Sequence, residues 1–188
     1  MITATRLIAP GEVFSGETID LRLVTMEDCT DRYVAWLEDP QVNRYLETRW
    51  SPQTLESVKG FVSAISADPA SYLFAIIEKS TGRHVGNIKV GPINARHAFA
   101  DISYFVGERA SWGKGLGTDA IRVATHLAFD RLGVHRLQAG LYAGNIGSAK
   151  ALQKAGYRYE AKFAAQLRGP DGWEDHLWYV QFKSEVGK

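Results

Sequence analysis

The 188-residue sequence contains a single cysteine, Cys29, so no intramolecular disulfide can form. No segment approaches the roughly 20 apolar residues that a membrane-spanning helix requires. Residues 1–16 contain no apolar run of signal-peptide length either. These absences predict a reduced, cytoplasmic protein without a membrane partner.

The chain also lacks an excess of charge of either sign. Its 22 lysines and arginines balance 21 aspartates and glutamates, which gives a formal net charge of +1. Nucleic-acid binding requires a basic face, and here the basic residues are interspersed with acidic ones, so no nucleic-acid partner is expected. No metal-ligand spacing surrounds the cysteine, and no metal is expected. An anionic ligand must therefore be bound by local features.

Hydrophobic residues make up 45% of the chain, which is enough for a real core. Neither an internal repeat nor a Gly/Pro-rich linker divides it. We therefore expect one domain over residues 1–188, with residues 1–16 as an N-terminal extension.

Apolar periodicity predicts a mixed α/β order of elements. Helices are expected over residues 26–38, where Thr25 and Asp28 could form a capping box, and from Pro52 in a first turn to about residue 67. A long helix should end at Gly133 and a short one should cover residues 147–155. Strands are expected at residues 19–23, at 71–78 and 84–90 as a hairpin, at 98–106 and 135–142, and on both sides of a turn at 169–172.

A glycine-rich segment precedes the long helix. Gly113, Gly115 and Gly117 lack the Cβ atoms that would keep a phosphate away from the backbone. The free N–H groups and the dipole at a helix start attract anions, Lys114 adds charge and Thr118 adds a hydroxyl donor, so the expected guest is a pyrophosphate. The spacing matches neither a P-loop nor a dinucleotide fingerprint, which disfavours ATP and NAD. Taken alone, the glycines could equally serve only a tight helix entry.

Two stretches carry a family resemblance. Residues 111–120 read SWGKGLGTDA, and residues 145–157 read NIGSAKALQKAGY. The first resembles motif A of the GNAT N-acetyltransferases, specifically of their RimJ/RimL-like (ribosomal-protein N-terminal acetyltransferase) branch. The second is similar to that family's Asn and Ser before a helix that ends in Gly and an aromatic residue. The resemblance implies an α/β GNAT fold, in which a mixed, mostly antiparallel sheet is flanked by helices and splayed at the acetyl-CoA site.

The resemblance also assigns acetyl-CoA to particular residues. In the family the loop amides hold the CoA pyrophosphate, and the general pattern has Gln or Arg where this chain has Trp112. The pantetheine arm would lie between residues 102–106 and 137–142, bonded to backbone near Phe105 and Val106 and contacted by Asn145. The implied pyrophosphate ligands are Gly113, Lys114, Gly115, Leu116, Gly117 and Thr118. Lys114 could equally be a solvated surface charge, and Asn145 a helix cap.

The leaving thiolate needs a proton donor. Many family members have a Tyr where this chain has Leu152, and Ser148 is similar to a hydroxyl proposed to meet the thiolate. Ser148 or water would then act as the acid, although Ser148 could also be only a cap.

A general base must remove a proton from the ammonium of the acceptor. Asp101, on the strand that leads to the glycine loop, is the first choice; it could also be a solvent-facing strand residue. Glu47, His97 and Tyr104 are the other candidates, whereas His135 and His176 are expected to be structural.

Transfer should proceed by direct attack of the amine, because no Cys or Ser sits in a nucleophile–base arrangement. The region 38–51 could recognise the acceptor or could be a simple packed loop; its charged and aromatic residues include Asn43, Arg44, Tyr45, Glu47, Arg49 and Trp50. A small amine or amino sugar is favoured slightly over a protein N-terminus. The alternative is a non-catalytic acyl-CoA sensor. Exposed edges of the terminal hairpin could also pair two copies as a homodimer.

Overall fold

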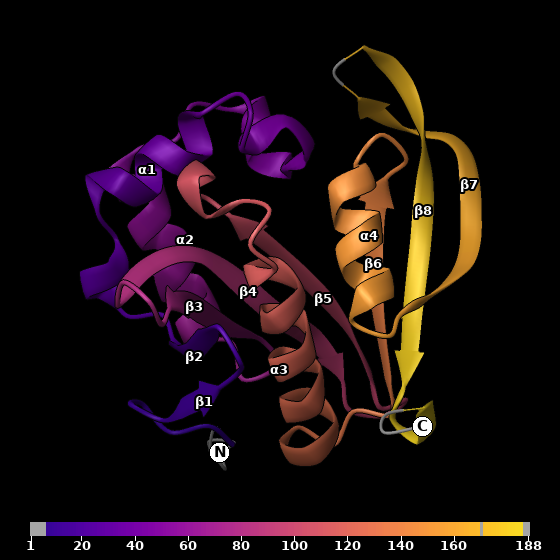
Figure 1. The fold of residues 1–188 in the computed structure, drawn as a ribbon, viewed down its shortest axis with the longest axis horizontal. Coiled ribbons are helices and arrows are strands. Elements are labelled where there is room, and N and C mark those ends of the chain that lie inside the picture. Colours follow the sequence, from indigo (N-terminus) through magenta and orange to yellow (C-terminus); the bar gives the residue numbers. More distant parts are fainter. Residues whose placement is uncertain (1–6, 170, 186–188) are drawn as a thin grey trace.

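The computed structural model describes residues 7–169 and 171–185, and its strands form one sheet with helices on both faces (Figure 1). The helices are α1 (Asp31–Glu38), α2 (Leu55–Ala67), α3 (Leu116–Arg131) and α4 (Ile146–Lys154). The strands are β1 (Val13–Ser15), β2 (Ile19–Leu23), β3 (Tyr72–Glu78), β4 (Arg83–Asn94), β5 (Phe99–Val106), β6 (Arg136–Tyr142), β7 (Arg158–Gly169) and β8 (Gly172–Phe182). None of the described helices is long and apolar enough to cross a membrane.

The sheet has the order β1-β2-β3-β4-β5-β6-β8-β7. Strands β1 to β5 form an antiparallel meander, β5 and β6 are parallel, and β6, β8 and β7 are again antiparallel. The mixed, mostly antiparallel sheet predicted from the resemblance is therefore confirmed. β1 lies within the segment 1–16 and pairs with β2.

Two hydrophobic cores lie on opposite faces of the sheet because successive side chains of a strand point to opposite sides. On β3, Phe74 and Ile76 belong to the core under α3 and α4, whereas Leu73 and Ala75 belong to the core under α1 and α2. Figure 1 shows α3 in front of the sheet and α2 behind it. The two faces are called the α3 face and the α2 face below.

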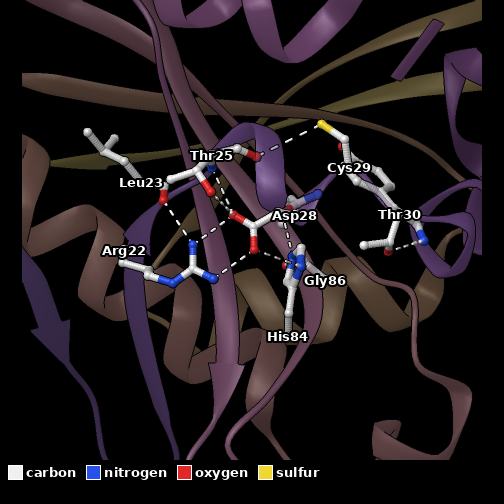
Figure 2. Close-up of polar contacts among 10 residues, drawn as sticks. Arg22, Leu23, Thr25, Asp28, Cys29, Thr30, His84 and Gly86 are labelled. Carbon is white, nitrogen blue, oxygen red and sulfur yellow. Dashed lines mark hydrogen bonds and ion pairs between the residues drawn. The ribbon is translucent and has the colours of Figure 1, made fainter. Parts of the chain in front are cut away.

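The expected helix over residues 26–38 is wrong in one respect, because it is divided. A 3-10 turn (Met26–Asp28) precedes α1, and Thr30 caps α1 by accepting a bond from Tyr33 N–H. The Asp28 carboxylate accepts the Thr25 N–H at 2.8 Å, as a capping box requires. It also accepts both Arg22 guanidinium nitrogens at 2.7 Å, which anchors the turn to β2 (Figure 2).

Burial raises the pKa of Asp28, but the bonds from Arg22 and Thr25 N–H lower it further, so it lies below its usual value. His84 approaches the same carboxylate at 3.7 Å from β4. This buried charged cluster joins the loop after β2 to the middle of the sheet (Figure 2).

Other expected helix ends can be compared with the described ones. Pro52 is not in the first turn of α2, because Thr54 is the N-cap and α2 begins at Leu55. Gly133 follows α3 with φ +68°, a left-handed stop that only glycine adopts without strain, so this predicted end is confirmed.

The sheet is open between β5 and β6. The two strands pair only at Phe99↔Arg136, Ala100↔Leu137 and Asp101↔Gln138, near their amino ends. Beyond these pairs they separate (Figure 1), so one edge of each strand faces a gap. We call this gap the splay; it is the feature that positions the candidate site.

Candidate functional site

The glycine loop has the backbone geometry of an anion site. Gly113 and Gly115 have φ values of +76° and +83°, and nothing lies within 4 Å of a Cβ added at either position. The first backbone bond of α3 runs from Asp119 N–H to the Gly115 carbonyl at 3.0 Å. The N–H groups of residues 116–118 precede it and have no intrahelical acceptor. The loop therefore presents several N–H donors at the positive end of a helix dipole.

Gly117 has a different reason to be glycine. A Cβ added there would lie 3.0 Å from Cε2 of Tyr104 on β5. This contact shows that Tyr104 lies on the α3 face and that α3 begins directly against the splayed strand.

The side chain of Lys114 is directed away from the glycine loop. Its Nζ lies 3.4 Å from Oε1 of the buried Glu78, and Ser111 donates to Oε2 of the same carboxylate at 3.3 Å. Burial raises the pKa of Glu78, but the Thr81 hydroxyl and the Lys114 charge lower it further, and the net position is below its usual value. Lys114 therefore also anchors the loop to β3.

Trp112, at the position where the resemblance departs from the general pattern, closes the end of β5. Its indole Nε1 donates to the Val106 carbonyl at 2.7 Å. The backbone near Phe105 and Val106 was expected to bond the cofactor, and here the Val106 carbonyl already accepts one bond.

Two cavities meet at the splay. The loop cavity, of about 410 Å³, is lined by the glycine loop, the start of α3 and one side of α4. The sheet cavity, of about 710 Å³, lies against the α2 face and is closed by α2, residues 45–53 and β8. Both are lined by the same short set of residues, which we call the junction: Tyr45, Leu46, Tyr104, Phe105, Asn145 and Ser148.

Neighbouring residues of β5 connect the two faces. Tyr104 faces α3, whereas the Phe105 ring lies 6.0 Å from Tyr33 and 6.3 Å from Trp36 of α1. A ligand that passes through the splay at these residues would therefore enter from the α3 face and end on the α2 face.

Asn145 and Ser148 lie together at the junction. Asn145 is the N-cap of α4, and its Oδ1 accepts the Ser148 N–H at 3.2 Å, so its capping role is present. Burial raises the pKa of Tyr104, and the neighbouring Ser148 side chain partly opposes this. Leu152 is buried one helical turn on and also lines the sheet cavity.

A carboxylate stands on the β6 side of the sheet cavity. Glu47 accepts the Tyr142 hydroxyl at 2.5 Å and the Trp50 indole at 3.1 Å. Arg49 donates to the Tyr142 hydroxyl at 3.0 Å and to the Arg168 carbonyl at 2.7 Å. Residues 43–50 are therefore docked onto the ends of β6 and β7, and the expectation of an acceptor region here coincides with the wall of the cavity.

His176 on β8 also lines the sheet cavity, although the sequence indicated only a structural role. Its Nδ1 lies 2.7 Å from Oε1 of Gln166, so with that oxygen facing it Nδ1 carries the hydrogen and Nε2 is left as an acceptor. Nε2 points at Gly140 of β6, because a Cβ added at Gly140 would lie 2.3 Å from it. Burial lowers the pKa of His176 and so favours the neutral ring, while the charge of Glu47 partly opposes the change.

The other candidates lie outside both cavities. Asp101 occupies the last paired position before the splay, and its Oδ1 accepts Gln138 Nε2 at 2.8 Å. His97 is exposed in the turn between β4 and β5. His135 packs against Phe182, and their ring centroids are 5.5 Å apart. Cys29 is buried under α2 with the core of that face.

Comparisons with known proteins identify the family and the fold. A model of the acetyltransferase (GNAT) domain matches residues 19–158. The probable N-acetyltransferase YjcK of Bacillus subtilis is 36% identical over 107 residues, which are 56% of this chain and 58% of that protein. The chain thus matches little more than half of that relative's length.

Solved structures are similar over nearly the whole chain. Mycobacterium smegmatis RimJ in complex with CoA-disulfide has a TM-score of 0.79 at 21% identity and covers 96% of this chain and 89% of its own. RimL, a ribosomal alpha-N-protein acetyltransferase in complex with coenzyme A, has a TM-score of 0.81 at 13% identity, with coverages of 91% and 98%. At these identities the likeness shows the shared fold.

Proposed function

The chain belongs to the GNAT acetyltransferase family, in its RimJ/RimL-like branch, and we propose that it transfers the acetyl group of acetyl-CoA directly to a primary amine. It is an N-acetyltransferase by family. The observation that supports direct transfer is that two cavities on opposite faces of the sheet share the junction residues. A cofactor in one cavity and an amine in the other would meet there without a covalent enzyme intermediate.

The residues present fit acetyl-CoA. Positive-φ glycines with open space above them and the free amides of residues 116–118 suit a pyrophosphate, and the unpaired edges of β5 and β6 suit an extended amide-bearing arm. We assign the cofactor to Gly113, Lys114, Gly115, Leu116, Gly117 and Thr118 for the phosphates, and to Phe105, Val106, Trp112 and Asn145 for the arm. Acetyl-CoA supplies an activated thioester at the junction.

Proton removal from the acceptor is assigned to His176. A neutral imidazole with a free Nε2 in the sheet cavity can accept a proton from the ammonium group. The Glu47 carboxylate, in the same cavity, would attract that ammonium and stabilise the imidazolium. Asp101 stands outside the lining, and its oxygen is already bonded to Gln138. It would have to act through an intervening group.

Proton donation to the leaving thiolate is assigned to Ser148. Its hydroxyl lies at the junction with the phenol of Tyr104 beside it. The raised pKa of Tyr104 keeps that phenol protonated, so it can support Ser148 as a donor. Leu152 provides no hydroxyl of its own.

The proposal is tested by acetyl-CoA-dependent release of free thiol with amino sugars, polyamines, amino acids and N-terminal peptides. Calorimetric titration of the cofactor accompanies it. Turnover with one class supports transfer and identifies the acceptor. Tight cofactor binding without turnover would favour the sensor function, and absence of binding would refute both.

A further inference from the structure

The floor of the sheet cavity carries a cation that no acid neutralises. Among the described residues that line this cavity, Lys89 has the one permanent positive charge and Glu47 the one carboxylate. Lys89 is half-buried on β4, and no carboxylate in residues 7–169 and 171–185 pairs with it. An ammonium group without a carboxylate partner can form a charge-assisted hydrogen bond with an anionic ligand.

Asn87 provides a second, independent donor beside it. Asn87 and Lys89 are two residues apart on β4 and therefore lie on the same face, and both line the sheet cavity. Asn87 is 2% exposed, and its Nδ2 makes no hydrogen bond to any described residue. The nearby Tyr33 hydroxyl does not meet the geometry of a hydrogen bond to this nitrogen.

The buried charged cluster fixes which amide atom of Asn87 is left without a partner. His84 Nε2 lies 2.9 Å from the Gly86 carbonyl, so this nitrogen must carry a hydrogen. The Asn87 atom 2.8 Å from the same nitrogen must then be the acceptor, Oδ1. His84 is itself held near Asp28 (Figure 2). Nδ2 is thereby left as the free donor of a side chain that cannot rotate without breaking this bond.

These donors lie at a defined place relative to the splay. Lys89 pairs with Ser103 of β5, whose hydroxyl also lines the cavity, and neighbouring strands lie about 4.8 Å apart. Glu47 stands on the far side of the splay, bonded to Tyr142 of β6. The cation and the carboxylate therefore flank the junction from opposite sides.

We propose that Lys89 and Asn87 form an anion-binding subsite that selects amine acceptors bearing a carboxylate or a phosphate several bonds from the amine. The inference rests on the proposed function. The ammonium of the acceptor lies toward Glu47 and His176, and its anionic group lies toward β4. An acceptor without the anionic group leaves Lys89 and the Asn87 amide unpaired. Such an acceptor therefore binds more weakly, and the site discriminates against it.

The test uses matched acceptor pairs that differ only in the anion. One pair is glucosamine 6-phosphate and glucosamine, and the other is a dipeptide and its C-terminal amide. Thiol release gives kcat/KM for each, and the full-length CoA-loaded protein is titrated calorimetrically with the same four compounds. The expected result is a 10- to 100-fold preference for the anionic member of at least one pair, about the value of a charge-assisted hydrogen bond. The pair that shows it distinguishes phosphate from carboxylate.

Variants test whether Lys89 causes the preference for the anionic acceptor. Lys89→Met should remove the preference and leave the neutral member unchanged, and Lys89→Arg should restore part of it. Lys59→Met, on the exposed side of α2, is the matched control. Equal turnover of both members, or an equal loss for both in Lys89→Met, would overturn the subsite while leaving the acetyltransfer proposal standing.

Calorimetry separates the remaining outcomes. If nothing is acetylated but the anionic member binds and Lys89→Met abolishes binding, the subsite holds and the proposed transfer fails. If neither turnover nor Lys89-dependent binding is found, both fail.

Discussion

Replacing His176 by glutamine is the most direct test of the assigned chemistry. The change retains a polar side chain on β8 but removes the Nε2 lone pair that points at Gly140 on the edge of the splay. A positioned general base contributes about 10²- to 10⁴-fold to rate, so kcat/KM for the amine should fall by at least 100-fold. The dissociation constant for acetyl-CoA should not change, because His176 lines the sheet cavity and not the loop cavity.

The pH profile distinguishes a base from a structural residue. Burial lowers the pKa of His176 from its usual value. The base must be unprotonated, so kcat/KM should rise with pH through this lowered pKa, and His176→Gln should lose that rise while keeping the one due to the substrate ammonium. His135→Gln, outside both cavities, is the matched control. The assignment would be refuted if His176→Gln lowered kcat/KM by less than 10-fold, or if the rise of kcat/KM at low pH were unchanged in the variant. Asp101→Asn would then be tested.

Four further outcomes follow from particular contacts. Gly115→Val should weaken acetyl-CoA binding more than 10-fold by calorimetry, because φ +83° is strained for a branched residue and its Cβ would enter the phosphate position. Glu47→Gln should raise KM for the amine more than it lowers kcat. Ser148→Ala should lower kcat with little effect on KM for the amine or for acetyl-CoA. Both variants are measured by thiol release. Asp28→Asn should destabilise the fold by about 2–3 kcal/mol in thermal unfolding, since it leaves the Arg22 guanidinium without its partner. The lowered pKa of Asp28 means that its contribution is complete above its unfolded pKa of about 4 and is lost as pH falls through the folded value. The variant should therefore lose less stability on acidification than the parent, and equal losses would contradict the argument.

The loop proposed to bind the cofactor could be predicted from the sequence because its residues are contiguous. Gly113 to Thr118 form one loop and helix start, and Asn145 and Ser148 form one cap, so local spacing is enough to indicate them. The division of the helix at Cys29 escaped prediction because a residue from β2, Arg22, engages the carboxylate of the capping box.

The acceptor side could not be read in the same way. Glu47, Asn87, Lys89, Tyr142 and His176 come from three strands and one 3-10 turn, and they meet only through the register of the sheet. His176 in particular depends on β8 lying next to β6 although β7 precedes it in the chain. Asp101 was a reasonable choice from its strand position, but the β5–β6 pairing ends at that residue and gives its carboxylate a neighbour, Gln138.

The division into two cavities has a consequence for specificity. In the proposed function the loop cavity binds its ligand through backbone amides, which side-chain substitutions leave in place, whereas the charged and basic side chains of the sheet cavity are Lys89, Glu47 and His176. Changes at these three residues should alter the acceptor without altering the affinity for acetyl-CoA. The exception is the junction, where Tyr45 and Leu46 wall both cavities on a segment that Arg49 ties to Tyr142. Coupling between cofactor and acceptor binding should therefore be carried by residues 45–49. Arg49→Lys, which cannot reproduce all three guanidinium bonds of Arg49, should weaken that coupling first.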